Sequence, residues 1–208
     1  VYHYDALNQT VEEEVFLETD KSYEVLKAEL GKLMYVNEQK QFFFLLNNCV
    51  YEIDLTNFEL KTLVEADTSD CYAVSKSGRY LAWISQENIN SSASITLEDL
   101  KMGITHDITS GTNTYLKPIT FIGEDFVYGV ANISDVKEDT VGKLMFPMSA
   151  IEILNTSEEK LEVIKEYRPQ GSKIGKVSVD ANNVYLRLIA ENAGRYAEVG
   201  EDTIMNRE

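Results

Sequence analysis

Residues 50–64, Val-Tyr-Glu-Ile-Asp-Leu-Thr-Asn-Phe-Glu-Leu-Lys-Thr-Leu-Val, contain a pattern that recurs along the chain. Apolar and polar side chains alternate over Val50–Leu55 and again over Leu60–Val64, as in half-buried strands. Thr56, Asn57 and Phe58 between them suit a tight turn. The stretch therefore predicts two antiparallel strands. The same layout recurs at residues 1–17, 94–108 and 150–164, and a partial copy begins at Arg195.

The copies follow one another at a nearly constant interval. Their first strands begin at residues 1, 50, 94, 150 and 195, and two further strands precede each complete copy. Four strands in about 40 to 50 residues are typical of a β-propeller blade, which buries both faces only by packing on its neighbours. We expect an all-β chain of four-stranded antiparallel meanders, forming about four blades. The expected blades are residues 32–69, 70–116 and 117–172, with partial blades at 1–31 and 173–208.

Two partial blades leave the row open at both ends. Closing a ring of four would place the strand near Tyr196 where residues 1–6 already lie, so we expect a piece of a larger propeller of six to eight blades. Uncovered blade edges and faces invite self-association. The connection Thr19–Leu30 is ambiguous, because Tyr23, Leu26, Lys27 and Leu30 have helical spacing. Strands on both sides favour a loop that ends in a short strand.

The charge and the apolar pattern exclude several classes of partner. With 35 acidic and 19 basic residues the formal charge is −16, which disfavours nucleic acid and anionic membranes. No apolar run approaches the roughly 20 residues of a membrane helix. The chain starts within a strand pattern, so we expect that a signal or anchor segment is not part of it. An extracellular or cell-surface location is our expectation.

Residues for metal binding or catalysis are scarce. Cys49 and Cys71 are the only cysteines, and a buried apolar pair is favoured over a disulfide bridge. His3 and His106 fall in strands of different blades, and no hydrolase, zinc, calcium or phosphate-loop motif is present. We therefore expect no metal, no cofactor and no catalytic residues. Trp83 lies within a strand and is expected to pack between blades.

Residues 75–83, Ser-Lys-Ser-Gly-Arg-Tyr-Leu-Ala-Trp, carry a resemblance to a known family. The segment resembles the turn and strand of TolB-type and related WD-repeat-like propellers, in which a Ser-Pro-Asp-Gly-like turn precedes a strand similar to Arg-Tyr-Leu-Ala-Phe. Lys76 and Ser77 replace the Pro and Asp here. The resemblance implies a propeller domain of a bacterial surface protein. It also implies an alternative role, since TolB-like propellers of one peptidase family accompany a separate hydrolase domain.

Long connections are predicted to gather on one face of the blades. They are residues 19–31, 86–93, 110–117, 132–149 and 167–172, whereas the turns on the other face are short. Loops on a rigid scaffold are where binding usually resides, so a protein, glycan or other small-molecule ligand is expected on the long-loop face. The candidate binding residues are Glu87, Asp135, Glu138, Asp139, Met145 and Phe146.

The insertion 132–149 leaves two interpretations open. Its apolar run, Leu144–Met148, is either an exposed patch for a partner or a loop that folds back over a blade edge or the channel. The sequence is compatible with three functions: a non-catalytic binding or scaffold domain, the accessory propeller of a hydrolase or peptidase, and a glycan-active propeller using carboxylates such as Glu87 or Asp70. The first agrees best with the lack of catalytic motifs.

Overall fold

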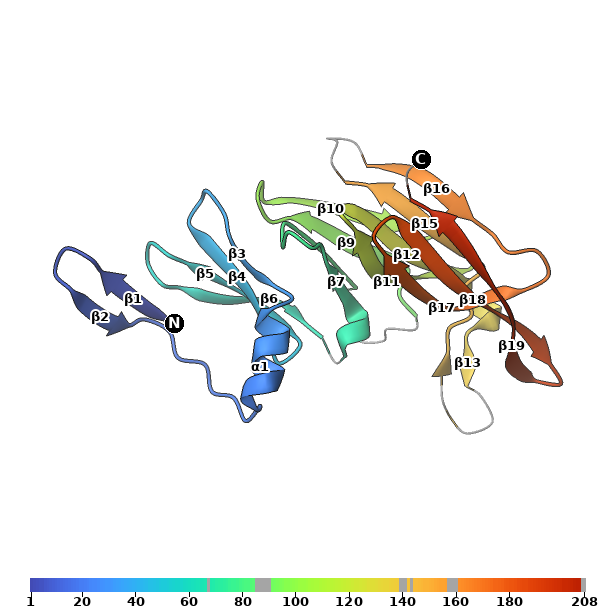
Figure 1. Ribbon diagram of the computed structural model, residues 1–208, viewed down its shortest axis with the longest axis horizontal. Helices are drawn as coiled ribbons and strands as arrows, with labels where there is room; N and C mark the ends of the chain where they lie inside the picture. The colour runs from blue at the N-terminus through green and yellow to red at the C-terminus, as the bar shows by residue number, and fades with distance from the viewer. Residues whose placement is uncertain (67, 85–90, 139–141, 143, 157–160, 207–208) are drawn as a thin grey trace.

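Antiparallel sheets follow one another in a row along the chain (Figure 1). The computed structural model describes residues 1–66, 68–84, 91–138, 142, 144–156 and 161–206. Three sheets have four strands each and one has three, which gives the all-β, propeller-like architecture that the repeats predict. The four-stranded sheets contain β3 (Met34–Val36), β4 (Gln41–Leu46), β5 (Cys49–Asp54) and β6 (Leu60–Glu65); β7 (Tyr72–Val74), β8 (Tyr80–Trp83), β9 (Ser94–Asp99) and β10 (Ile104–Thr109); and β11 (Thr114–Ile122), β12 (Asp125–Asn132), β15 (Ala150–Asn155) and β16 (Glu162–Tyr167).

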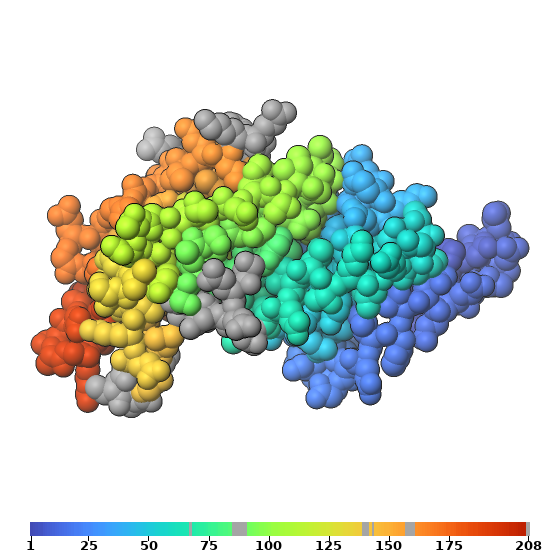
Figure 2. Space-filling view, turned by 180° about the vertical axis from the view of Figure 1, so that it is seen from behind, coloured from blue at the N-terminus to red at the C-terminus, as the bar shows by residue number. Residues whose placement is uncertain are grey.

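The two ends of the row are incomplete sheets. β1 (Tyr2–Asp5) and β2 (Thr10–Glu13) form a hairpin, which protrudes at one end in Figure 2. β17 (Lys173–Asp180), β18 (Asn183–Asn192) and β19 (Arg195–Met205) form the three-stranded sheet at the other end. Within the described residues these end sheets do not meet, and no ring closes (Figure 1). Membership in a larger propeller stays a prediction.

The hairpin β5–β6 shows how the sequence builds each unit. Ile53 pairs with Leu60 and Glu52 with Lys61, as the alternation requires. In the turn, the Asp54 carboxylate accepts hydrogen bonds from the Thr56 backbone N–H at 2.8 Å and from its hydroxyl at 2.6 Å. Phe58 takes the left-handed conformation, with φ of 59°. The predicted turn is thus held by its own polar side chains.

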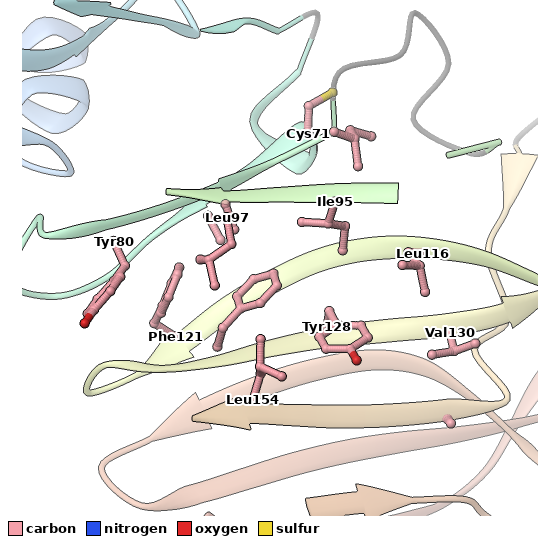
Figure 3. Packing of buried hydrophobic residues seen from close by; sticks show 14 residues of the cluster. Cys71, Tyr80, Ile95, Leu97, Leu116, Phe121, Tyr128, Val130 and Leu154 are labelled. Atoms are coloured by element: carbon pink, nitrogen blue, oxygen red, sulfur yellow. The ribbon is translucent and has the colours of Figure 1, made fainter. Parts of the chain in front are cut away.

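Apolar clusters lie between successive sheets rather than inside one sandwich. Adjacent side chains of a strand enter different clusters: Phe43 and Leu45 face the following sheet, and Phe44 and Leu46 face the connection that precedes β3, around Val15. In the same way, Phe126 and Tyr128 of β12 pack toward β7–β10, whereas Val127 packs toward β17–β19. Figure 3 shows the cluster between the second and third four-stranded sheets. Each inner sheet is therefore buried on both faces.

The connection before β3 corrects one expectation. We expected a loop ending in a short strand, but residues Tyr23–Leu30 form the helix α1, and β3 begins only at Met34. Leu26 and Leu30 pack on the cluster around Phe44, because the β1–β2 hairpin leaves part of that sheet face uncovered. The helical spacing of Tyr23, Leu26, Lys27 and Leu30 thus indicates the observed structure, and the strands on both sides do not extend into this segment.

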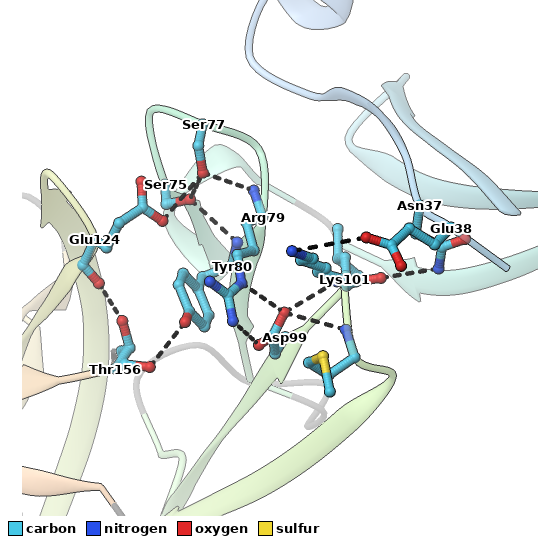
Figure 4. Close-up of polar contacts among 12 residues, drawn as sticks. Asn37, Glu38, Ser75, Ser77, Arg79, Tyr80, Asp99, Lys101, Glu124 and Thr156 are labelled. Carbon is cyan, nitrogen blue, oxygen red and sulfur yellow. Dashed lines mark hydrogen bonds and ion pairs between the residues drawn. The ribbon is translucent and has the colours of Figure 1, made fainter. Parts of the chain in front are cut away.

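Polar contacts join the short turns of neighbouring sheets (Figure 4). Arg79 donates to both carboxylate oxygens of Asp99, at 3.0 and 2.6 Å. Burial opposes ionisation of Asp99, but hydrogen bonds from Arg79, its positive charge and the following backbone amides hold the pKa of this carboxyl below its usual value. The Tyr80 hydroxyl donates to the carbonyl of Thr156 at 2.8 Å, and Thr156 in turn donates to the carbonyl of Glu124. Of these bonds, the one from Tyr80 to Thr156 links the second and third four-stranded sheets.

Candidate functional site

The longer connections emerge at one edge of the row. In Figure 1 the helix α1, the 3-10 turn η1 (Ser69–Cys71) and the small hairpin β13 (Lys137–Glu138) with β14 (Leu144–Met145) lie along the lower edge. The β3–β4 turn lies at the opposite edge. Two of the candidate binding residues, Glu87 and Asp139, lie outside the described residues.

The insertion between β12 and β15 is anchored to the C-terminal sheet by ion pairs. It begins with the 3-10 turn η2 (Ile133–Asp135), where Asp135 accepts from Lys173 at 2.7 Å and from Asn132 at 2.9 Å. Burial alone would raise the pKa of Asp135, but these two donors hold it below its usual value. Lys137 pairs with Glu191 at 2.6 Å. Asp135 is thus a structural anchor of the insertion.

The apolar run of the insertion folds back onto the sheets. Met148 exchanges two backbone hydrogen bonds with Ile174 of β17, at 2.9 and 2.8 Å, and its side chain is only 5% exposed. A Cβ atom on Gly129 of β12 would lie 2.2 Å from the Met148 sulfur, so the absence of a side chain there makes room for Met148. The run is therefore mostly covered, and only its first part reaches the surface.

A cavity of about 600 Å³ lies beneath this run. We call it the hairpin pocket. Its walls come from η1 with the end of the preceding loop, from β11 and from β17, and its roof from the insertion. Because β7, β11 and β17 are the first strands of their sheets, the pocket lies where the first-strand edges of three successive sheets meet. Its lining consists of Thr68, Ser69, Asp70, Tyr72, Lys117, Pro118, Ile119, Leu144, Met145, Phe146, Met148, Gly175, Lys176 and Val177.

The pocket has a charged part and an apolar part. Lys117 of β11 donates to Asp70 at 3.0 Å, and its ammonium lies 5.9 Å from the centre of the Phe146 ring. Lys176 of β17 also lines the pocket and forms no ion pair with any described residue. Burial raises the pKa of Tyr72, another lining residue, to about 12, so its phenol stays neutral. The lining thus carries two cations and one anion.

The pocket contains only part of the predicted site. It brings together Met145 and Phe146, whereas Asp135 anchors the insertion and Glu138 lies exposed on β13. Sequence reasoning missed Lys117 and Lys176 as binding candidates. Both belong to first strands of blades, and that position in the repeat is the signal that could have identified them.

Metal binding and histidine catalysis gain no support from the geometry. In the part of the chain that the structure describes, no three His, Cys, Asp or Glu residues are grouped as metal ligands. His3 lies on β1 and His106 on β10, in different sheets. Cys49 and Cys71 are free thiols. Among the described helices, none has the length and apolar character needed to cross a membrane.

Comparisons with known proteins add similarities to solved structures. No family model and no curated protein matches the chain. It is similar to a candidate conserved lipoprotein from Clostridium novyi NT, with 10% identity over 70% of this chain and 91% of that one and a TM-score of 0.49. TolB from Acinetobacter baumannii has 15% identity over 76% of this chain and a TM-score of 0.38. Dipeptidyl peptidase 4 from Porphyromonas gingivalis has 11% identity over 95% of it and a TM-score of 0.28. The chain spans 37% of that TolB and 41% of that peptidase.

Proposed function

We propose that this chain is a non-catalytic binding module whose ligand occupies the hairpin pocket on the long-loop face. The observation that supports this most is the placement of a cavity of about 600 Å³ where three blades converge beneath the longest insertion. Cavities of this size that combine apolar walls with a few polar groups are typical of small-molecule sites. The rigid sheets hold Lys117, Ile119 and Val177, while the insertion supplies Met145 and Phe146.

The test uses a variant that fills the pocket. Ser69 lies exposed on η1 and lines the pocket, so Ser69→Trp places an indole in the cavity without disturbing a sheet. The matched control is Lys61→Trp, an exposed position on β6 outside the pocket. Ligand-observed NMR with a library of chemically diverse fragments is run on both variants and on the wild type, after circular dichroism confirms folding.

We expect fragments that bind the wild type to lose binding to Ser69→Trp and keep it with Lys61→Trp. Fragments that bind Ser69→Trp as well as the wild type would refute the pocket as the site. The accessory role beside a hydrolase domain stays a prediction, and a hydrolase motif in the parent gene would favour it. The extracellular or cell-surface location also stays a prediction, which fractionation of the source cells tests.

A further inference from the structure

We infer that the hairpin pocket selects an anionic ligand with an apolar body, that is, an amphiphilic carboxylate. This inference rests on the proposed function and specifies the chemistry of the ligand. Its basis is the arrangement of two lysines beside an apolar wall in a chain that is otherwise strongly acidic, with 35 acidic residues against 19 basic ones.

The charges of the lining favour an anion. Lys117 and Lys176 contribute two positive charges and Asp70 one negative charge, so the lining has a local excess of one cation. Lys117 already donates to a carboxylate at 3.0 Å, which shows that its ammonium is directed at an oxygen acceptor. A ligand carboxylate can share that donor and also approach Lys176, which has no ion-pair partner among the described residues. A cationic ligand would instead have to displace Lys117 from Asp70.

The apolar part of the lining favours a ligand with an apolar body. Ile119 and Phe146 line the pocket and pack against the cluster between the last two large sheets, and Met145 is half-buried beside them. The thioether of methionine is flexible and polarizable, so it adapts to apolar groups of varied shape. The Phe146 ring also lies beside the Lys117 ammonium, and the charged and apolar parts of the pocket are therefore adjacent. A ligand that carries its carboxylate at one end of an apolar group matches both parts.

Calorimetric titration of the full chain tests the charge preference with three probes that share one alkyl chain: decanoate, decanamide and decylamine. A second pair, the acetylated peptide Gly-Leu-Phe as its free acid and as its amide, distinguishes a peptide end from a free carboxylic acid. We expect decanoate, the peptide acid or both to bind more tightly than their neutral analogues. Because a hydrogen bond to a charged group is lost, Lys117→Gln and Lys176→Gln should each weaken binding about tenfold.

One variant changes affinity in the opposite direction. Asp70→Asn removes the carboxylate that competes for Lys117, so it should tighten the binding of decanoate severalfold, which a loss of structure would not do. The control is Lys101→Gln, because the Lys101 side chain is 44% exposed at a turn outside the pocket, where it lies 3.8 Å from Glu38. Equal binding of decanamide, or tighter binding of decylamine, would overturn the inference while leaving the pocket as a binding site. Failure of every probe to bind the wild type would contradict both the inference and the proposed function.

Discussion

Replacing Gly129 with alanine tests whether the roof of the hairpin pocket is held by the packing of Met148 into β12. An alanine Cβ would lie 2.2 Å from the Met148 sulfur, 2.9 Å from its Cγ and 3.3 Å from Cδ1 of Ile119. The first two distances are too short, and Met148 is fixed by its backbone bonds to Ile174. We expect overpacking of this kind to cost about 1–3 kcal/mol in the free energy of unfolding.

The companion variant Met148→Ala separates overpacking from other effects of the alanine. On its own, truncating a methionine that is 5% exposed should cost about 2–5 kcal/mol. Once the sulfur and Cγ are gone, Gly129→Ala no longer overlaps with Met148. Alanine is preferred over glycine within a strand by roughly 0.5–1 kcal/mol. In the Met148→Ala background, Gly129→Ala should therefore be neutral or slightly stabilising.

The assay is urea unfolding of the four proteins, followed by far-ultraviolet circular dichroism and by the fluorescence of Trp83, the single tryptophan. Trp83 packs on the cluster between the first two four-stranded sheets, so it also shows whether the effect stays local. The coupling energy of the cycle should be about 1–3 kcal/mol. An equal loss of stability from Gly129→Ala in both backgrounds would show that contact with Met148 is not what destabilises the variant.

Three further predictions concern the turns and the helix. Asp99→Asn removes the ion pair with Arg79 but keeps an acceptor for the turn amides, and should lower the free energy of unfolding by about 1.5–3 kcal/mol in urea titrations. Glu38→Gln removes the pair with Lys101, whose charged atoms lie 3.8 Å apart at the surface, and should change the free energy of unfolding by less than about 0.5 kcal/mol. Because folding lowers the pKa of Asp99, its pairing stabilises the fold above about pH 4 and is lost on further acidification, so unfolding measured between pH 3 and 6 should vary less with pH in Asp99→Asn. Leu30→Ala should lower the free energy of unfolding, measured by thermal denaturation, by about 1–2 kcal/mol, because it removes packing on the first four-stranded sheet. Val25→Ala, at a position 41% exposed, should leave the free energy of unfolding nearly unchanged.

The strands were predictable because the order of apolar and polar residues along each one reflects which faces of the sheet are buried. Phe43 and Phe44 are adjacent in β4 and are 2% and 4% exposed, on opposite faces of the sheet. A continuous apolar run of this length is the expected sequence of a strand buried on both sides. The recurrence of four strands in about 40 to 50 residues then predicted that the sheets follow one another along the chain. The helix α1 was missed because it has only two turns, of which Leu26 and Leu30 alone pack on the neighbouring cluster, so its sequence signal is weak and tertiary packing determines it.

The candidate site was predictable only where its residues are unusual locally. Met145 and Phe146 are part of a conspicuous apolar run in a long insertion. Lys117 and Lys176 look like ordinary surface lysines in sequence, and they are 59 positions apart. Only the packing of successive sheets brings β11 and β17 to the same cavity. Long-range packing of this kind has no local pattern, so this part of the site could not be read from the residues alone.

The two ends of the row differ in a way that bears on self-association. On the outer face of β18–β19, Arg187 pairs with Glu198 at 3.2 Å and with Glu201 at 3.9 Å. Covering that face with another sheet would remove these charges from water at considerable cost. On the β1–β2 hairpin, His3 faces the ring of Phe58, so Tyr2, Tyr4 and Val11 lie on the other side.

Those three side chains are 67%, 59% and 64% exposed. The Glu13 carboxylate, which interacts with the Tyr2 hydroxyl, lies on the same side, so a sheet packed there would bury one charged group, against three on the outer face of β18–β19. Self-association through open blade edges stays a prediction, and the physical chemistry of the two surfaces favours the hairpin end for it.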